Sequence, residues 1–372
     1  MNKREHLYYF DYLRVMAGLF VIFMHVAAGP LRRELCVDWY LLNLVTSLSF
    51  TAVPLFLMMS GYLTLSSEKT MDTGLLLKKR LPRLVVPLAG WTVVILLWRM
   101  ISVKQFSIKT LYEGLVGALS SPAGVHLWYM YTLIALTVIS PILRGGLNAL
   151  DKKGHILVVS IIAVISLRTM VMIFTPGWLD RILNVDVITQ LTFFSGHLAT
   201  YILGYYLGSL KKKIPNWILI VGIVVLFATI VVGTYWKTVT AGEYDATFQS
   251  QSRGFEVVLA ACMFLFFKQN CNKKSKILSA IPVVPLSLPI YLMHNVLLSM
   301  MYFVGLKVDG FIDVAGATLI NFAVCFLVMK TVATVKPLCY LATGMTFREA
   351  CETCNWIYTV RRIKARRVDH KK

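Results

Sequence analysis

Three side chains that carry charge or can move protons lie in the first apolar run of the chain, residues 8–27. They are Asp11, Arg14 and His25 in the stretch YYFDYLRVMAGLFVIFMHVA. A helix turns about 100° per residue, so Arg14 and His25 share one face, about 16 Å apart along the axis. Asp11 and Gly18 lie on the same face, and polar groups at membrane depth face a bundle interior or a wet cavity. The alternative is an interfacial Asp11–Arg14 pair with His25 at the outer end.

A second candidate is the arginine pair in LKKRLPRLVVP, residues 77–87. Arg80 and Arg83 are about one helical turn apart and can converge on a single anion. Guanidinium groups form forked hydrogen bonds with phosphate, so the pair predicts a phosphate-binding position. The competing interpretation is the ordinary excess of cations at the cytoplasmic end of a membrane helix.

Four further polar residues are candidate substrate-binding groups. Ser60 precedes Gly61 in PLFLMMSGYL, a pattern that predicts close helix packing and leaves open a hydroxyl that faces a cavity. The other three lie in or beside apolar runs, where polar groups are rare: His126, Glu256 and His294. Packing alone remains the alternative for Ser60, and a position at the membrane interface is the alternative for His126.

The composition is that of a polytopic membrane protein with an all-α fold. Of 372 residues, 57% are hydrophobic and 15% charged, and the mean hydropathy is +0.68. Apolar runs long enough to cross a bilayer recur along the chain, which predicts about ten transmembrane helices. The expected crossings are 8–29, 39–65, 84–101, 125–143, 156–175, 188–210, 214–235, 251–268, 277–304 and 311–335.

The net charge of +20 fits membrane topology better than binding to nucleic acid. With the N-terminus inside, the cytoplasmic segments hold 26 Lys and Arg residues and the external segments hold 8. This bias predicts that both ends are cytoplasmic. The first apolar run lacks a small-residue cleavage site, so we expect it to remain as a membrane helix.

The chain is predicted to consist of a membrane domain, residues 1–344, and a cytoplasmic tail, residues 345–372. In the tail, Thr346 and Glu349 match a capping box at a helix start. Apolar residues then fall on one face and basic residues follow, so we expect an amphipathic helix on the inner leaflet. Cys351 and Cys354 form a lone CxxC, which with His370 gives too few ligands for zinc, and we expect no metal.

Taken together in order, these motifs resemble those of the family-3 membrane acyltransferases. FDYLRVMAGLFVIFMH resembles the family's first helix, with Arg and His at matching spacing, and RLPR resembles its Arg-x-x-Arg motif. PLFLMMSGYL, HLWYM and PIYLMHNVLL resemble the segments that follow. The resemblance runs from residue 8 to about residue 300.

The resemblance implies an O-acyltransferase whose functional core is Arg14, His25, Arg80 and Arg83. Acyl-CoA, most simply acetyl-CoA, would be the donor substrate in the cytosol, with no resident cofactor, and the arginines would hold its phosphates. His25 would be the base for an acceptor hydroxyl outside, on a carbohydrate or a related acceptor, and Asp11 would orient Arg14 or hold a water. The implied location is a cell membrane, that of a bacterium.

Two features of the resemblance leave the acceptor and the activity open. Many glycan-modifying members carry an additional extracytoplasmic domain, and residues 1–372 contain no such segment. The membrane part also resembles that of membrane-bound serine racemases, which implies a second hypothesis, a transporter for a small polar solute such as an amino acid. His197, Glu256 and His294 would serve such a transporter, but it has no need of the Arg80–Arg83 pair.

Overall fold

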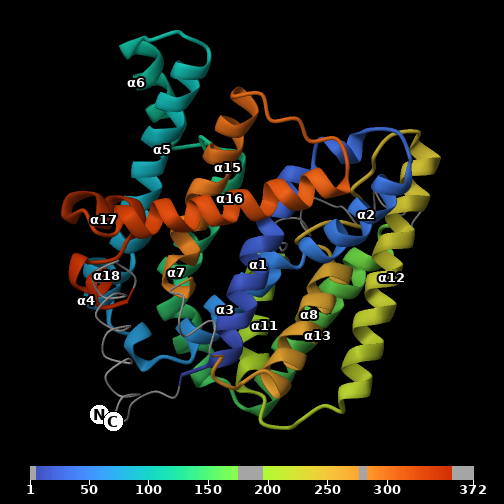
Figure 1. The fold of residues 1–372 in the computed structure, drawn as a ribbon. Coiled ribbons are helices and arrows are strands. Elements are labelled where there is room, and N and C mark those ends of the chain that lie inside the picture. The colour runs from blue at the N-terminus through green and yellow to red at the C-terminus, as the bar shows by residue number, and fades with distance from the viewer. Residues whose placement is uncertain (1–5, 175–195, 276–282, 354–372) are drawn as a thin grey trace, which may run out of the picture. The chain divides into compact units, whose positions relative to one another are not determined.

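The computed structural model describes residues 6–174, 196–275 and 283–353, and within these ranges it is helical and contains no β-strand (Figure 1). The predicted all-α fold is confirmed. Eight helical segments of the described ranges are long and apolar enough to cross a membrane. They are Tyr8–Ala27, Val37–Leu65, Thr73–Ser102, Val125–Ala149, Lys152–Val171, Asn216–Ala241, Val284–Phe303 and Phe311–Val332.

Two other predicted crossings coincide with shorter helices. The predicted crossing 188–210 contains α11, His197–Ser209, of 13 residues, and the crossing 251–268 corresponds to α13, Gly254–Asn270, of 17 residues. The first part of the crossing 188–210 lies outside the described residues, as does the start of 277–304. The count of ten and the cytoplasmic location of both termini stay predictions.

The chain divides into two compact units. Unit 1 comprises Met1–Thr73, Ile139–Lys274 and Val308–Val314, and unit 2 comprises Gly74–Val138, Ser275–Lys307 and Ala315–Lys372. Two of the boundaries fall inside long helices, α7 (Trp128–Ala149) and α16 (Phe311–Val332), so each of these helices belongs partly to both units.

Unit 1 is built around the first helix, α1. Its other helices are α2 (Val37–Ser49), α3 (Ala52–Leu65), α8 (Lys152–Val171), α11, α12 (Asn216–Ala241) and α13, with the short turns η1 (Pro30–Arg32) and η2 (Glu68–Thr70). Aromatic side chains fill the core between α1 and α13, where the Tyr9 and Phe264 rings meet edge to face at 5.7 Å. Leu13 and Met58 are fully buried in the same cluster. One side of α1 is therefore committed to packing.

Helices α3 and α11 of unit 1 are in close contact, and this contact depends on glycine. A Cβ atom on Gly61 of α3 would overlap the backbone carbonyl of Tyr201 on α11. In the opposite direction, a Cβ on Gly204 would overlap the backbone of Met58, and one on Gly208 would overlap the Tyr62 ring. Small residues let membrane helices approach until their backbones touch. The close contact predicted from Ser60-Gly61 is confirmed.

The second crossing is interrupted between α2 and α3. Pro54 has no amide hydrogen to donate to the Phe50 carbonyl, four residues earlier, and its ring crowds that carbonyl. The chain responds with a tight turn in which the Thr51 amide donates to the Leu48 carbonyl at 3.2 Å. Helix α3 then resumes at Ala52. The interruption therefore lies three to four residues before the proline itself.

Buried amides fasten α2 to α12 and to the loop that follows α12. Asn43 donates to the Val231 carbonyl of α12 at 3.0 Å. From the loop, Gln249 donates to Asn43 Oδ1 at 2.9 Å and to the Ser47 hydroxyl oxygen at 2.8 Å. These groups are almost fully buried, so their hydrogen bonds hold the loop firmly.

Unit 2 contains the arginine pair and the C-terminal helices. Its elements are α4 (Thr73–Leu75), η3 (Leu76–Arg80), α5 (Pro82–Ser102), α6 (Ile108–Gly117), η4 (Val125–Leu127), η5 (Val284–Leu286), α15 (Ser287–Phe303), α17 (Lys336–Thr343) and α18 (Phe347–Thr353), with most of α16. Helix α17 packs on α5 (Figure 1). Trp91 of α5 donates its indole hydrogen to the Ala342 carbonyl at 3.0 Å, which fixes the end of α17 beside the middle of α5.

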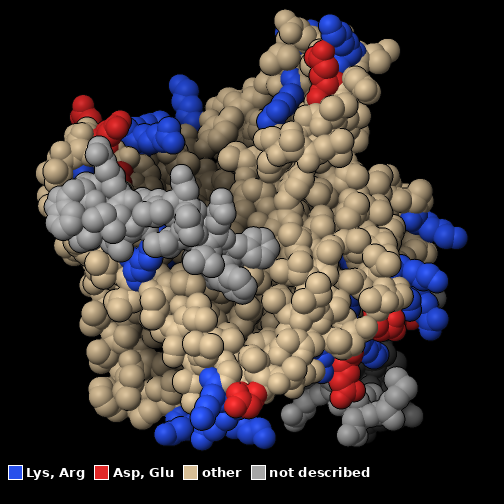
Figure 2. Space-filling view, turned by 180° about the vertical axis from the view of Figure 1, so that it is seen from behind, with Lys and Arg blue, Asp and Glu red and all other residues tan. Residues whose placement is uncertain are grey.

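Charged side chains are sparse on the face of the molecule shown in Figure 2. Most of the face visible in Figure 2 consists of uncharged residues, and the Lys and Arg residues form small groups, mainly near its edges. Many large apolar side chains are exposed, among them Ile142 and Val164. An apolar exterior of this kind is the expected surface of a helix bundle in lipid.

Candidate functional site

The polar stripe of the first helix lies beside the packed face of that helix. Helix α1 is unbroken from Tyr8 to Ala27, so Arg14 and His25 share the helix face expected from their spacing. Both are partly exposed, in contrast with Leu13, which is fully buried. The stripe is therefore partly accessible at Arg14 and at His25, whereas Val21, between them on the helix, is buried.

Asp11 has a partner that the sequence did not suggest. Its Oδ2 atom lies 2.6 Å from Nε2 of His6, an exposed residue just before α1. The pairing joins the residues just before α1 to its first turn. A carboxylate there also interacts favourably with the helix dipole. Asp11 thus has a structural role at the start of the stripe, besides the predicted role beside Arg14.

Glu256 is the buried acidic residue of unit 1. It lies in the first turn of α13, its side chain is fully buried, and within the described residues neither carboxylate oxygen has a hydrogen-bond partner. A buried carboxylate without hydrogen bonds lowers stability. A buried residue that lowers the stability of the fold is a strong candidate for a functional role.

Replacing Glu256 by glutamine is expected to raise the thermal midpoint of the purified protein by a few degrees. The amide has the same shape and is less costly to bury, by roughly 1–3 kcal/mol. Thermal unfolding in detergent measures the effect. Glu243→Gln, at an exposed loop position of the same unit, should leave the midpoint unchanged, and a lower midpoint for Glu256→Gln would show that the carboxylate stabilises the fold.

Ser60 lies on α3 next to the glycine that contacts α11. Gly61 is buried against Tyr201, whereas Ser60 is partly exposed. Gly61 thus lies in the contact between α3 and α11, and the Ser60 hydroxyl lies on a neighbouring face of α3. Its predicted role as a substrate-binding group remains open.

The arginine pair of unit 2 lies where two helical geometries meet. Arg80 ends the π-helical turn η3, and Arg83 lies in the first turn of α5. The Leu81 amide donates to the Leu76 carbonyl at 2.9 Å, five residues earlier, because the helix is wider here. Single π-turns are frequent at functional sites. Both arginine side chains are partly exposed, as binding to a soluble anion requires.

Arg83 is in contact with the C-terminal segment. Its Nη2 donates to Oε1 of Glu349 in α18 at 2.5 Å. Partial burial raises the pKa of Glu349, but hydrogen bonds from Thr346 and Arg83 together bring that pKa below its ordinary value. The carboxylate is therefore ionised beside Arg83 at neutral pH. The capping box predicted from Thr346 and Glu349 is confirmed, since the Thr346 amide donates to Glu349 Oε2 at 3.0 Å.

His126 and His294 come together in the interior of unit 2. Their ring centroids are 5.0 Å apart, and both side chains are buried. His126 donates from Nε2 to the Leu292 carbonyl at 3.1 Å and accepts at Nδ1 from Asn295 at 3.1 Å. A neutral imidazole satisfies this pattern with both nitrogens. His126 is therefore held in one orientation, with both ring nitrogens in hydrogen bonds.

His294 is oriented by its own helix turn and by α16. Its Nδ1 donates to the Tyr291 carbonyl at 2.5 Å, and Asn321 donates to the His294 carbonyl at 2.9 Å. The neutral ring then carries its lone pair on Nε2. Tyr291 also donates its hydroxyl hydrogen to the His126 carbonyl. Sequence reasoning missed Asn295 and Asn321 as members of this cluster, although an asparagine within an apolar run is a signal for one.

The candidate residues thus divide between the two units. Unit 1 holds Asp11, Arg14, His25, Ser60 and Glu256. Unit 2 holds Arg80, Arg83, His126 and His294. Cys354, His370 and the basic end of the tail lie outside the described residues. The leaflet-anchoring role of the tail stays a prediction, and its described start contacts protein through Glu349.

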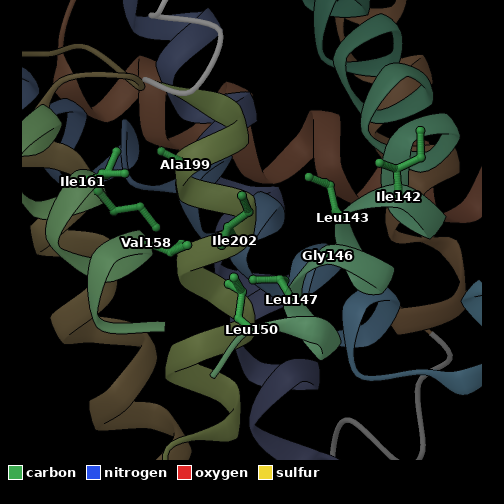
Figure 3. A pocket seen from close by; sticks show the side chains of 10 residues that line it. Ile142, Leu143, Gly146, Leu147, Leu150, Val158, Ile161, Ala199 and Ile202 are labelled. Atoms are coloured by element: carbon green, nitrogen blue, oxygen red, sulfur yellow. The ribbon is translucent and has the colours of Figure 1, made fainter. Parts of the chain in front are cut away.

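Two apolar pockets are lined by none of these residues. One, of about 270 Å³ in unit 1, is lined by α7, α8 and α11 (Figure 3). The side chains at its wall are aliphatic, including Leu143, Val158 and Ile202. The other, of about 280 Å³ in unit 2, is equally apolar and lies between α5, α15, α16 and α17. Neither offers a group that could bind phosphate or move a proton.

Comparison with protein families matches residues 7–330 to the Acyltransferase domain model (Acyl_transf_3). No curated protein and no solved structure matches the chain. The matched region includes every candidate residue in α1, α3, α5, α13 and α15, and the described helices have the length and hydropathy of membrane crossings. The chain therefore belongs to the family-3 membrane acyltransferases and is a multi-pass membrane protein.

Proposed function

We propose that the protein transfers an acyl group, acetyl in the simplest case, from cytosolic acyl-CoA to a hydroxyl of an extracytoplasmic acceptor, a carbohydrate. The family match is the observation that carries the proposal. It does not favour the transporter hypothesis. A bacterial plasma membrane is the proposed location.

The chemistry assigned to the first helix is general base catalysis. His25 takes the proton of the acceptor hydroxyl while its oxygen attacks the thioester carbonyl. The carbon–sulfur bond then breaks, and the departing CoA thiolate takes that proton, so the products are the ester and free CoA. Arg14 supports binding of the anionic donor, and Asp11, one turn earlier, positions Arg14.

The chemistry assigned to the arginine pair is recognition of the donor. CoA carries a pyrophosphate and a ribose phosphate, which are ligands for guanidinium groups. Arg80 and Arg83 bind these phosphates in the proposal. Partial exposure of both side chains is consistent with that role. Ser60, Glu256, His126 and His294 are proposed to contact the substrates, His126 through a fixed ring.

Arg83→Ala is expected to weaken CoA binding by roughly tenfold or more, the value of one charge-assisted hydrogen bond. Isothermal titration of CoA into the detergent-solubilised protein measures this. Arg83→Lys should recover part of the affinity, because an ammonium group keeps the charge and loses the fork.

Arg348→Ala is the matched control for this titration. Arg348 is an exposed arginine of unit 2 that pairs with Glu352 at 3.0 Å. Its replacement should leave the affinity for CoA unchanged. Equal affinities of the parent and Arg83→Ala would remove Arg83 from the donor site.

A further inference from the structure

The C-terminal segment places a carboxylate on the arginine that is proposed to bind the donor. Arg83 and Glu349 are joined at 2.5 Å, and both side chains are partly exposed, 42% for Arg83 and 40% for Glu349. An ion pair with this exposure is weak and open to competition from solutes. The contact can therefore be exchanged for another anion without unfolding the segment.

The carboxylate is held in place by the local structure of α18. Its second oxygen, Oε2, accepts from the Thr346 amide at 3.0 Å and from the Thr346 hydroxyl at 2.9 Å. The neighbouring Ala350 is fully buried, which anchors the helix. Glu349 thus presents Oε1 to Arg83 with little loss of side-chain entropy on pairing.

The backbone before α18 is also fitted to Arg83. Gly344 ends α17 with a φ of +69°, and a Cβ atom there would overlap the Arg83 carbonyl. A glycine is required both for this conformation and for this approach. The proximity of Glu349 to Arg83 is therefore a built feature of unit 2 and does not depend on one flexible side chain.

A carboxylate oxygen and a phosphate oxygen make the same kind of charge-assisted bond with a guanidinium group. While Glu349 holds Nη2, it takes one of the donors that a phosphate would use and cancels positive charge at the position. An incoming anion has to displace Oε1 or bind to a site of reduced charge. Either effect lowers affinity for anions.

We propose that Glu349 sets the affinity of the Arg83 site for anions, as an internal carboxylate that competes with the phosphates of the donor. This inference rests on the proposed function in taking CoA as the ligand. More generally, the Arg83 site binds phosphate-bearing anions, and Glu349 lowers its affinity for all of them.

Glu349→Gln tests the proposal, because a glutamine at this position keeps the capping box and loses the charge. We expect the Kd for CoA to fall roughly two- to fivefold, the strength of a partly exposed ion pair. Glu352→Gln is the matched control. It removes the same charge from the same helix, but Glu352 pairs with Arg348, so the Kd should stay at the parent value.

Two further titrations test whether Glu349 changes the Kd through Arg83 and at the anion site itself. Adding Glu349→Gln to Arg83→Ala should leave the Kd of the single Arg83 variant unchanged, because the competitor acts only through Arg83. Inorganic pyrophosphate, titrated in parallel, should bind Glu349→Gln more tightly than the parent. The pyrophosphate titration tests the anion site without assuming that CoA is the donor.

The outcomes separate the two ideas. An unchanged or raised Kd for Glu349→Gln, with Arg83→Ala still weakening binding, overturns the inference and leaves the proposed donor site intact. Tighter pyrophosphate binding by Glu349→Gln without any CoA binding supports the inference and overturns CoA as the donor. Failure of the parent to bind either anion overturns both. Misfolding cannot mimic the expected result, since it does not tighten binding.

Discussion

Replacement of His25 by alanine is expected to reduce acyl transfer at least about 100-fold while CoA binding stays at the parent level. Loss of a general base removes roughly 10²–10⁴ in rate. Binding is unaffected because the phosphate ligands in the proposal are arginines. The measurement is release of free thiol from acetyl-CoA by the detergent-solubilised protein, with water or an added glycan as acceptor, beside a CoA titration.

His155→Ala is a suitable control for this experiment. His155 belongs to unit 1, lies in the first turn of α8, and contacts the Tyr206 hydroxyl at 2.9 Å through Nδ1. Its loss should leave thiol release unchanged. If His25→Ala keeps the parent rate, His25 is not the base, and if it loses CoA binding too, the division of roles between His25 and the arginines is wrong.

Gly204→Ala is expected to have the largest effect on stability. The new methyl group would overlap the backbone of Met58, which cannot move aside as a side chain can. Helices α3 and α11 would have to separate, at a cost of at least about 3 kcal/mol, the upper part of the range for overpacked sites. Thermal unfolding followed by size-exclusion chromatography should show a midpoint lowered by many degrees or no folded protein.

The control for the glycine substitution is Gly146→Ala. Gly146 is a helical glycine of unit 1 with nothing within 4 Å of its Cβ position. Alanine there should be neutral or stabilising by up to about 1 kcal/mol, the difference in helix propensity. If Gly204→Ala unfolds at the parent temperature, the α3–α11 contact is looser than the structure shows.

Local patterns explain why much of the fold could be predicted. The apolar run around Arg14 and His25 has the length of one crossing, and the structure contains that helix. The Thr346–Glu349 pattern describes a helix start within four residues, so it too could be predicted. The break before α3 follows from Pro54 alone. Each of these features depends on residues close together in the chain.

The parts that could not be predicted depend on residues far apart in the chain. Arg83 and Glu349 are 266 positions apart, and nothing in either motif indicates the other. The approach of His126 to His294 depends in the same way on the packing of unit 2. The glycines Gly204 and Gly208 form a small-xxx-small pattern that was available in the sequence. The pattern indicates a close helix contact but does not name the partner helix.

The interruption between α2 and α3 has a mechanical consequence for unit 1. Each half of this crossing is fastened to a different helix, α2 to α12 through Asn43 and α3 to α11 through Gly61. Both halves also pack against α1. The change of direction at Phe50–Thr51 therefore lets one crossing reach two different neighbours, so that a single stretch of chain joins α11, α12 and α1 into one bundle.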